Sequence, residues 1–360
     1  MRVTLGDVCE KGASNIKQSD IANMTGEYPI YGAAGYIGNV DFYHQEKPYV
    51  AIVKDGAGIG RTTLHPAKSS VIGTMQYLLP KDNVLPEYLC YVVRHMHLEK
   101  YFTGATIPHI YFRDYKNEKF NLDSLDKQAE IIEILGKAES IILKRRKELA
   151  ELDNLIKARF VEMFGDSRSN PFGFEKKMLK DTCKVITGNT PSRAIAEYYG
   201  DYIEWIKTDN IVSGVLNPTQ ATESLSEKGM DVGRIVEKDS ILMACIAGSI
   251  ASIGRVCVTD RTVAFNQQIN AIVPIQYNVS FLYVLLQMSK DYLVEDINMA
   301  LKGILSKSKL EEKEFIVPPM ELQGQFADFV EQTDKSKVVV QKALDEAQTL
   351  FDSLMQEYFG

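Results

Sequence analysis

The chain is 360 residues long, which exceeds the usual size of one hydrophobic core and predicts two domains. Its hydrophobic content of 45% and charged content of 25% are ordinary for a globular protein and exclude a disordered or fibrous chain. The formal net charge of -7 argues against general nucleic-acid affinity. A DNA-binding face would have to gather its basic residues locally or borrow positive charge from a partner.

Composition also limits the compartment and the chemistry. No run of about 18 apolar residues occurs, and the N-terminal residues lack the basic and apolar blocks of a signal peptide, so we expect a cytoplasmic protein with no membrane partner. The five cysteines are odd in number and never spaced C-x-x-C. This favours reduced, buried thiols over a disulfide framework or a metal site.

The first domain, residues 1–121, is predicted to be mixed α/β. Short apolar runs such as Tyr49–Val53 are typical of strands, and a helix is expected over Glu87–Tyr101, after Pro86. The glycine-rich segment Gly56–Arg61 resembles a phosphate-binding loop, but its G-x-G-x-G spacing and the strand-like residues that follow favour a tight turn between strands.

A long helix is predicted for residues 122–165. Apolar residues recur there every seven positions, which is typical of a helix-packing seam: Leu135, Ile142, Leu149, Ile156 and Met163. The basic run Lys144–Lys147 lies within this segment, and we interpret it as a solvated helix face in preference to a DNA or partner contact.

The second half, residues 166–316 and 317–360, repeats the first at an offset near 195 residues. Gln128 aligns with Gln323, and the seam recurs through Val330, Leu344, Phe351 and Tyr358, interrupted by Lys337. A second strand-rich region includes Ser240–Ala244, and a helix is expected over Phe281–Ile297, capped by Ser280. The repeat predicts two mixed α/β domains related by a pseudo-twofold, with two long helices that bury their apolar stripes against each other.

Several blocks, in order, resemble one known family over the whole chain. In the second half these are Gly188–Arg193, Tyr198–Gly200, Trp205–Thr208 and Asn266–Gln268; in the first half they are Tyr28–Gly32, Lys54–Ala57 and Thr106–Tyr115. The chain is thereby similar to the specificity subunits of type I restriction-modification systems. One departure is that the first helical segment opens with Leu122–Leu125, where the second opens with Val317–Met320 and its prolines.

The resemblance implies two target-recognition domains that read the two halves of a bipartite DNA site, with antiparallel helices as a spacer between them. It implies a subunit without catalytic activity and with no cofactor of its own. Its expected partners are double-stranded DNA, two modification subunits that bind S-adenosylmethionine and methylate adenine, and restriction subunits.

Base readout needs side chains with suitably placed donors and acceptors, with Arg suited to guanine and Asn or Gln to adenine. The predicted DNA-binding residues are Lys54, Arg61, Thr106, His109, Thr190, Ser192, Arg193, Lys207, Gln267 and Gln268. For Asn266–Gln268 an alternative role in satisfying backbone groups at a strand end stays open. We interpret Trp205, the only tryptophan, as a core residue in preference to a base-stacking platform.

Two other functions compete with this one. A nucleotide- or S-adenosylmethionine-binding enzyme would use the Gly56–Gly60 turn, although the sequence shows none of the adenine-methyltransferase, P-loop or zinc-protease motifs. The five scattered histidines fit surface or satisfied positions better than catalytic ones. A coiled-coil scaffold would have no DNA role, and charge reversal at Arg193 and Lys207 would then leave any DNA interaction unchanged.

Overall fold

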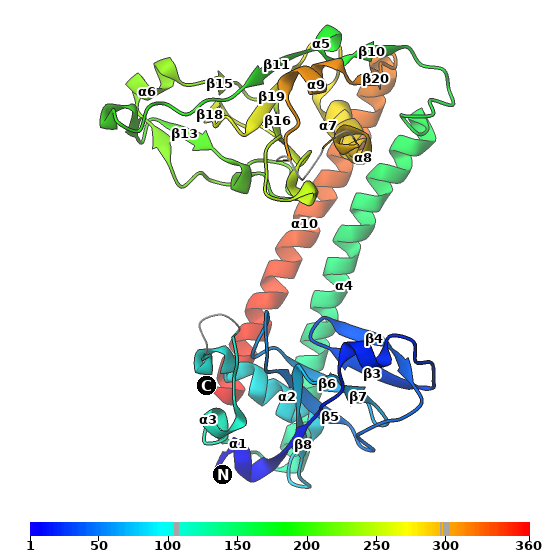
Figure 1. Ribbon diagram of the computed structural model, residues 1–360, viewed down its shortest axis with the longest axis vertical. Coiled ribbons are helices and arrows are strands. Elements are labelled where there is room, and N and C mark those ends of the chain that lie inside the picture. Colours follow the sequence, from blue (N-terminus) through cyan, green and yellow to red (C-terminus); the bar gives the residue numbers. More distant parts are fainter. Residues whose placement is uncertain (104–107, 296, 298–302) are drawn as a thin grey trace. The chain divides into compact units, whose positions relative to one another are not determined.

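A computed structural model describes residues 1–103, 108–295, 297 and 303–360. They form two compact units, one made of Met1–Lys147 with Gln341–Gly360 and the other of Glu148–Val340. Both are mixed α/β, as the sequence predicted (Figure 1). Among the described residues, no helix is both long and apolar enough to cross a lipid bilayer.

In the first unit, the described residues form three sheets, in the orders β2-β8-β5-β6, β4-β3-β7 and β1-β9. Their strands are β1 Arg2–Thr4, β2 Cys9–Ala13, β3 Tyr28–Gly32, β4 Gly35–Val40, β5 Tyr49–Val53, β6 Thr62–His65, β7 Ser70–Val71, β8 Met75–Pro80 and β9 Lys119–Asn121. The helices are α1 Leu5–Val8, α2 Pro86–His95, α3 Phe112–Tyr115 and the 3-10 turns η1 Gln18–Ile21 and η2 Leu98–Tyr101. The main core lies where α2 packs on the four-stranded sheet.

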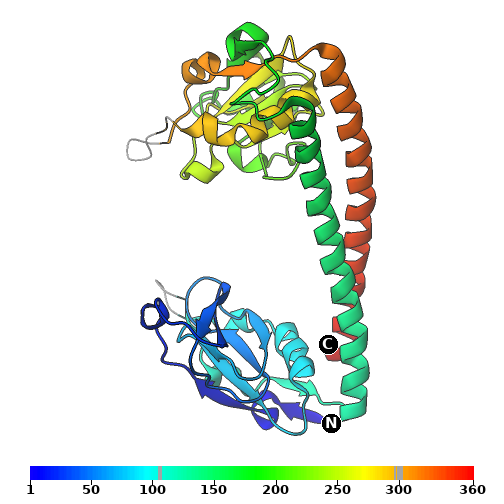
Figure 2. The same ribbon diagram turned by 90° about the vertical axis from the view of Figure 1, so that its right-hand side faces the viewer.

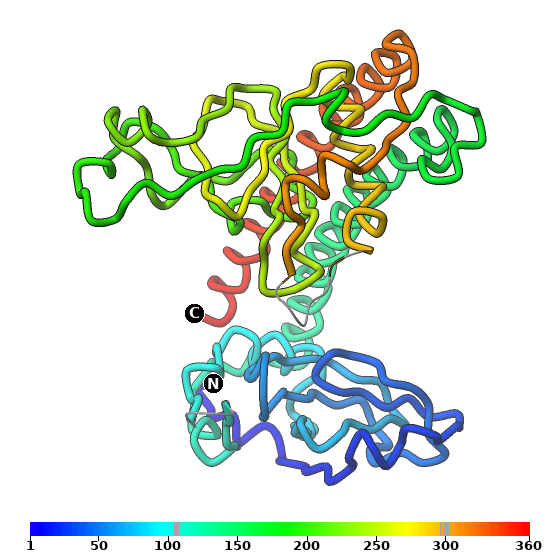
Figure 3. The backbone as a smooth tube through the Cα atoms, turned by 45° about the horizontal axis from the view of Figure 1, so that its top comes forward, coloured from blue at the N-terminus to red at the C-terminus, as the bar shows by residue number. Residues whose placement is uncertain are grey.

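The part of the second unit that the structure describes also has three sheets, in the orders β11-β19-β16-β17, β12-β14-β13-β18-β15 and β10-β20. Their strands are β10 Lys176–Met178, β11 Cys183–Thr187, β12 Tyr199–Gly200, β13 Ile203–Ile206, β14 Ser224–Leu225, β15 Ile235–Val236, β16 Ile241–Ala244, β17 Val256–Val258, β18 Val263–Phe265, β19 Ile269–Pro274 and β20 Glu314–Ile316. The helices are α5 Leu179–Thr182, α6 Glu227–Val232, α7 Val279–Met288, α8 Lys290–Val294, α9 Lys307–Glu312 and the 3-10 turns η3 Ala196–Tyr198, η4 Thr208–Asn210 and η5 Ile250–Ser252. Figure 3 follows the backbone from residue 165 into β10.

The predicted internal repeat is confirmed by sheet topology. The order β2-β8-β5-β6 in the first unit corresponds, strand for strand, to β11-β19-β16-β17 in the second, and α2 corresponds to α7. The turns that follow the equivalent strands β5 and β16 also contain the same backbone hydrogen bond. The Gly60 amide donates to the Val53 carbonyl at 2.9 Å, and the Gly254 amide donates to the Ala244 carbonyl at 2.8 Å.

Two helices of 40 residues each belong partly to one unit and partly to the other: α4 Leu125–Phe164 and α10 Met320–Phe359. In the first unit, Leu135 near the start of α4 shares a core cluster with Met355 near the end of α10. In the second unit, the end of α4 lies beside the start of α10 (Figure 2). The rings of Phe160 and Phe326 meet there, with centroids 5.6 Å apart. The helices are therefore antiparallel, as predicted.

Burial along the helices follows the predicted seam. Leu135, Ile142 and Ile156 are buried, whereas Leu149, Leu344 and Phe351 are partly exposed. Lys337, which interrupts the second seam, is explained by its partners: its ammonium group lies 2.7 Å from Asp153 of α4 and 3.0 Å from Asp334. An ion pair between helices thus occupies the place of an apolar contact, and these two carboxylates offset the burial of the lysine.

The repeated glutamines Gln128 and Gln323 make the same contact in the two units. Both side chains are fully buried. The Gln128 side-chain oxygen accepts from the Leu85 amide at 2.8 Å, and that of Gln323 accepts from the Asn278 amide at 2.9 Å. Each glutamine thereby ties a long helix to the residue before α2 or α7. The start of α4 lacks the prolines that precede α10, yet both helices begin with the same kind of hydrogen bond. The Gln128 backbone amide donates to the Ser124 carbonyl, and the Gln323 backbone amide donates to the Pro319 carbonyl.

We expect Gln323→Met to destabilise the second unit by about 1–3 kcal/mol, because the Asn278 backbone amide would lose the acceptor that the fully buried Gln323 side chain supplies. Urea unfolding followed by the fluorescence of Trp205, which lies in this unit, measures the change. Gln325→Met is the matched control at an exposed position of the same helix, with an expected change within about 0.5 kcal/mol. Equal losses in the two variants would contradict the assigned role.

Both predicted domain helices are shorter than expected. α2 ends at His95, since His97 adopts a left-handed conformation with φ of 51° before a separate 3-10 turn. α7 ends at Met288, and its N-cap is Asn278, whose side chain accepts from the Ser280 and Phe281 amides, so the prediction of Ser280 as the cap was wrong. All five cysteines are buried, as predicted.

Candidate DNA interface

In the second unit, the segment Gly188–Arg193 crosses the end of the β18 strand. The Gly188 amide donates to the Ile269 carbonyl at 3.0 Å, and the Asn189 amide donates to the Phe265 carbonyl at 3.2 Å. A Cβ atom added at Gly188 would lie only 2.1 Å from the Asn266 carbonyl oxygen. Close backbone approach therefore requires glycine at this position.

Trp205 holds the segment Gly188–Arg193 in place through a hydrogen bond to its backbone. Its side chain is buried in a small cluster with Ile203, Leu225 and Ala264, and its indole nitrogen donates to the Asn189 carbonyl at 3.2 Å. The Tyr199 hydroxyl likewise donates to the Pro191 carbonyl at 2.6 Å. The interpretation of Trp205 as a core residue is confirmed, and the indole fixes the loop that carries the predicted DNA-binding side chains.

Arg193 and Lys207, both predicted DNA-binding residues, meet at one carboxylate. Glu223 accepts from Nη2 of Arg193 and from Nζ of Lys207, each at 2.6 Å. The hydrogen bond from Lys207, and to a lesser extent the one from Arg193, holds the pKa of the Glu223 carboxyl below its usual value. The Arg193 guanidinium carbon also lies 4.4 Å from the ring centroid of Tyr199. Sequence reasoning missed Glu223, which precedes the short strand β14 outside every recognised block.

Thr190 and Gln267 are also brought together. The Thr190 hydroxyl donates to the Gln267 side-chain oxygen, and both residues are exposed. Ser192 is exposed as well. Gln268 is held locally, because its backbone amide donates to the Asn266 side chain at 3.0 Å and its own side-chain oxygen accepts from Asn266 at 3.1 Å. The Asn266 side chain thus accepts from a backbone amide just after β18, which is the alternative role that the sequence left open.

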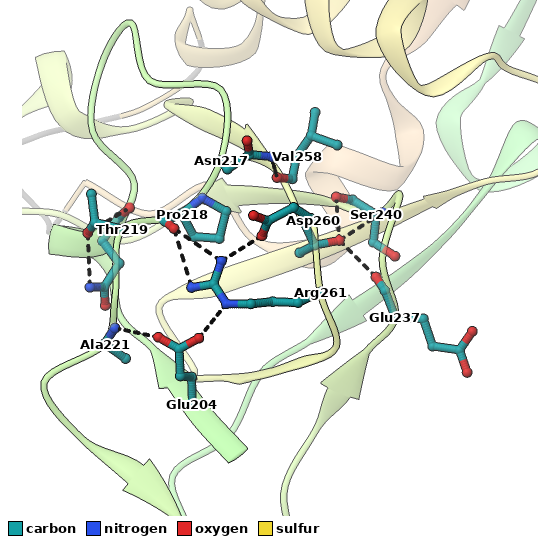
Figure 4. A network of polar contacts seen from close by, with 12 residues as sticks. Glu204, Asn217, Pro218, Thr219, Ala221, Glu237, Ser240, Val258, Asp260 and Arg261 are labelled. Atoms are coloured by element: carbon teal, nitrogen blue, oxygen red, sulfur yellow. Dashed lines mark hydrogen bonds and ion pairs between the residues drawn. The ribbon is translucent and has the colours of Figure 1, made fainter. Parts of the chain in front are cut away.

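A polar network around Arg261 and Glu204 holds the segment 218–221, which precedes Glu223 in the chain (Figure 4). Arg261 donates to Glu204 of β13, to Asp260 at 2.6 Å and to the Pro218 carbonyl at 3.4 Å. The other Glu204 oxygen accepts from the Ala221 amide at 2.8 Å. Arg261 beside it holds the pKa of the Glu204 carboxyl below its usual value. Because Pro218 and Ala221 are pinned, Glu223 two residues further on is held near Arg193 and Lys207.

In the first unit, Lys54 and His109 meet at Asp55, a residue that sequence reasoning did not single out as a site. The Asp55 carboxylate pairs with the ammonium of Lys54 and with Nδ1 of His109. The Gly56 amide donates to the Pro108 carbonyl at 3.0 Å, so the backbone joins the same two segments. Asp55 thus joins His109 to the start of the glycine-rich turn. Thr106, also a predicted DNA-binding residue, lies outside the described residues.

The predicted reader Arg61 does not join this group. It is exposed, and its guanidinium donates to the Ala33 carbonyl at 3.0 Å. The segment Gly56–Arg61 connects the antiparallel strands β5 and β6, as expected for a strand-to-strand turn. Gly56, Gly58 and Gly60 all have positive φ. The turn does not open a helix, so it lacks the helix N-terminus that a dinucleotide fingerprint needs.

Comparison with known proteins decides the family. The family model described as "Type I restriction modification DNA specificity domain" matches residues 1–154 and 171–347, which together cover most of both halves. The chain belongs to this family. The match spans most of both units, including most of α4 and α10.

Individual relatives agree with this assignment. The Type I restriction enzyme HindI specificity subunit of Haemophilus influenzae is 34% identical over 149 residues, which are 40% of this chain and 31% of that protein. The MjaIX specificity subunit of Methanocaldococcus jannaschii is 23% identical over 305 residues, which are 77% of this chain and 69% of that protein. The match thus spans less than a third of the Haemophilus subunit.

Solved structures share the fold of these specificity domains. The S subunit of a type I restriction-modification system from M. genitalium aligns with a TM-score of 0.62 and 15% identity, over 100% of this chain and 96% of that one. A chain from a study of type I R-M complex assembly and conformational transition aligns with a TM-score of 0.55 and 14% identity, over 99% and 97%. At these identities the likeness supports the architecture alone.

Proposed function

We propose that this chain is the DNA-recognition subunit of a type I restriction-modification complex and reads a bipartite, asymmetric site. The observation that carries the proposal is the match of the specificity-domain family to both halves of the chain. The four-stranded sheets of the two units have the same strand order, so each half would carry one recognition domain.

The two candidate surfaces lie on different parts of the repeated fold and differ in side chains: Lys54 and Asp55 follow β5, whereas Lys207 follows β13 and Glu223 precedes β14. In the second unit, Arg193 and Lys207 flank a glutamate; in the first, Lys54 and His109 flank an aspartate. Because hydrogen-bonding side chains specify bases, different sets imply different half-sites. The recognised sequence is therefore expected to be asymmetric.

The spacing between the half-sites is assigned to α4 and α10. Each is continuous for 40 residues, or about 60 Å at 1.5 Å per residue. A continuous helix resists bending far better than a loop of the same length. The ion pair Lys337–Asp153 and the contact of Phe160 with Phe326 hold the pair in register within the second unit.

The chemistry is assigned to partners. We propose that two modification subunits supply S-adenosylmethionine and methylate adenine, that restriction subunits join them for cleavage, and that this chain binds no cofactor and catalyses no step. The strand-to-strand geometry of the Gly56–Arg61 turn supports this division. Partners would also supply positive charge around the DNA, which this chain, at -7, lacks overall.

Two measurements test the proposal. The chain with its modification subunit should protect one two-part DNA sequence with a fixed gap, and methylated adenines in host DNA should mark that sequence only when the chain is present. Random methylation, or protection that does not depend on gap length, would refute it.

A further inference from the structure

We propose that Arg193 reads a guanine in the major groove and that Glu223 is the positioning residue that aims it. The inference rests on the proposed function and refines it by naming one base of the half-site read by the second unit. It assigns different roles to Arg193 and Lys207, which the sequence placed in one group.

The Arg193 guanidinium is exposed yet held on two sides. Its side chain is 57% exposed, its Nη2 donates to Glu223, and its guanidinium carbon lies over the rings of Tyr199 at 4.4 Å and Trp205 at 5.3 Å. A guanidinium carries five N–H donors, and among the described residues no hydrogen bond is recorded from Nε or Nη1 of Arg193. The guanidinium therefore keeps unused donors, on Nε and Nη1, on a side chain that is more than half exposed.

Such donors match guanine better than the other bases. Guanine presents two acceptors, O6 and N7, side by side in the major groove, and a guanidinium can donate to both at once. Holding the guanidinium in place before binding reduces the side-chain entropy lost when the contact forms. The ring contacts and the Glu223 ion pair supply that restraint.

The neighbouring carboxylate argues for a base contact over a phosphate contact. Glu223 offsets one of the two positive charges of Arg193 and Lys207, and it would repel a phosphate placed against the same group. Base edges are uncharged, so this repulsion is much weaker there. A phosphate contact would also need no fixed orientation of the guanidinium plane.

Lys207 is assigned a supporting role. Its side chain is 26% exposed, it donates to Glu223, and its ammonium lies 5.2 Å from the Trp205 ring centroid. It thus holds the second oxygen of Glu223 while Arg193 uses the first. The Arg261–Glu204 network, which pins Ala221, extends this support to the segment that carries Glu223.

The test uses the chain in complex with its modification subunit and duplexes that carry the mapped site. Each guanine is replaced in turn by 7-deazaguanine, which lacks the N7 acceptor. For the parent complex we expect one guanine whose replacement weakens binding about tenfold. Arg193→Ala should weaken binding to the natural duplex and abolish the further effect of the replacement at that guanine only.

Two variants complete the design. Arg234→Ala removes another exposed arginine of the same unit and should leave the tenfold discrimination intact. Glu223→Gln keeps the shape of the side chain but removes its charge, and we expect it to reduce the discrimination while strengthening binding to unrelated DNA. A residue that merely stabilised the fold would change both affinities together.

Equal weakening of natural and 7-deazaguanine duplexes by Arg193→Ala would identify a phosphate contact and overturn the inference. Unchanged binding by Arg193→Ala, or a mapped site without a G·C pair, would overturn it as well. A parent complex that showed no sequence preference at all would instead refute the proposed function.

Discussion

Replacing Phe326 by alanine is expected to destabilise the second unit by about 3–5 kcal/mol, the usual cost of emptying a large aromatic position in a core. The Phe326 ring is fully buried, and its centroid lies 5.6 Å from those of Phe160 and Phe164 in α4 and 6.3 Å from that of Phe281 in α7. The cavity would open where α4 and α10 pack against α7, so these three helices would lose contacts together.

Urea unfolding monitored through Trp205 reports this unit, because the only tryptophan of the chain lies within it. Val338→Ala, at an exposed position of the same helix, is the control and should change the free energy of unfolding by less than about 0.5 kcal/mol. If the Phe326 variant unfolded at the same urea concentration as the control, the helices would not be packed as described.

Gly188→Ala is expected to weaken specific DNA binding by about tenfold or more, the effect of losing one well-made base contact. The added Cβ would lie 2.1 Å from the Asn266 carbonyl oxygen and 2.5 Å from that of Phe265. Both atoms belong to backbone at the end of β18, so the loop must move instead. Its movement would break the Trp205–Asn189 and Thr190–Gln267 hydrogen bonds and displace Arg193.

Gly248→Ala is the matched control, since nothing lies within 4 Å of its added Cβ and it falls in a turn of the same unit. Equilibrium binding of the complex to cognate and unrelated duplexes measures both variants. We expect the Gly188 variant to lose the preference for the cognate duplex and the Gly248 variant to keep it. Undiminished preference in the Gly188 variant would mean that this loop does not face DNA.

The features predicted well from the sequence are those set by periodicity and duplication. A seven-residue apolar repeat needs only local helix geometry to be recognised, and it located the seam through Leu135, Ile142 and Ile156. The alignment of Gln128 with Gln323 predicted equivalent roles, and the structure shows the shared reason: each buried glutamine accepts a hydrogen bond from the backbone amide just before a domain helix. The order of the strands followed from neither pattern.

The features that could not be predicted depend on contacts between distant residues. Glu223 lies 30 residues from Arg193 and gains its role only because the chain folds back beside Lys207. Asp55 was within a recognised block, yet its pairing with His109 depends on how two loops meet. The N-cap of α7 was missed because Asn278 and Ser280 are both good caps, and the Gln323 contact with the Asn278 amide favours the first.

The central claim is that α4 and α10 set the distance between two different half-sites. Its most direct test is to delete one heptad from each helix, residues 144–150 and the aligned residues 339–345, and to map methylated adenines in host DNA. Each helix would shorten by about 10 Å, equivalent to at most about three base pairs. We predict the same two half-sites with a shorter gap. The parent gap in the deletion variant, or altered half-sites with no change in spacing, would contradict the account.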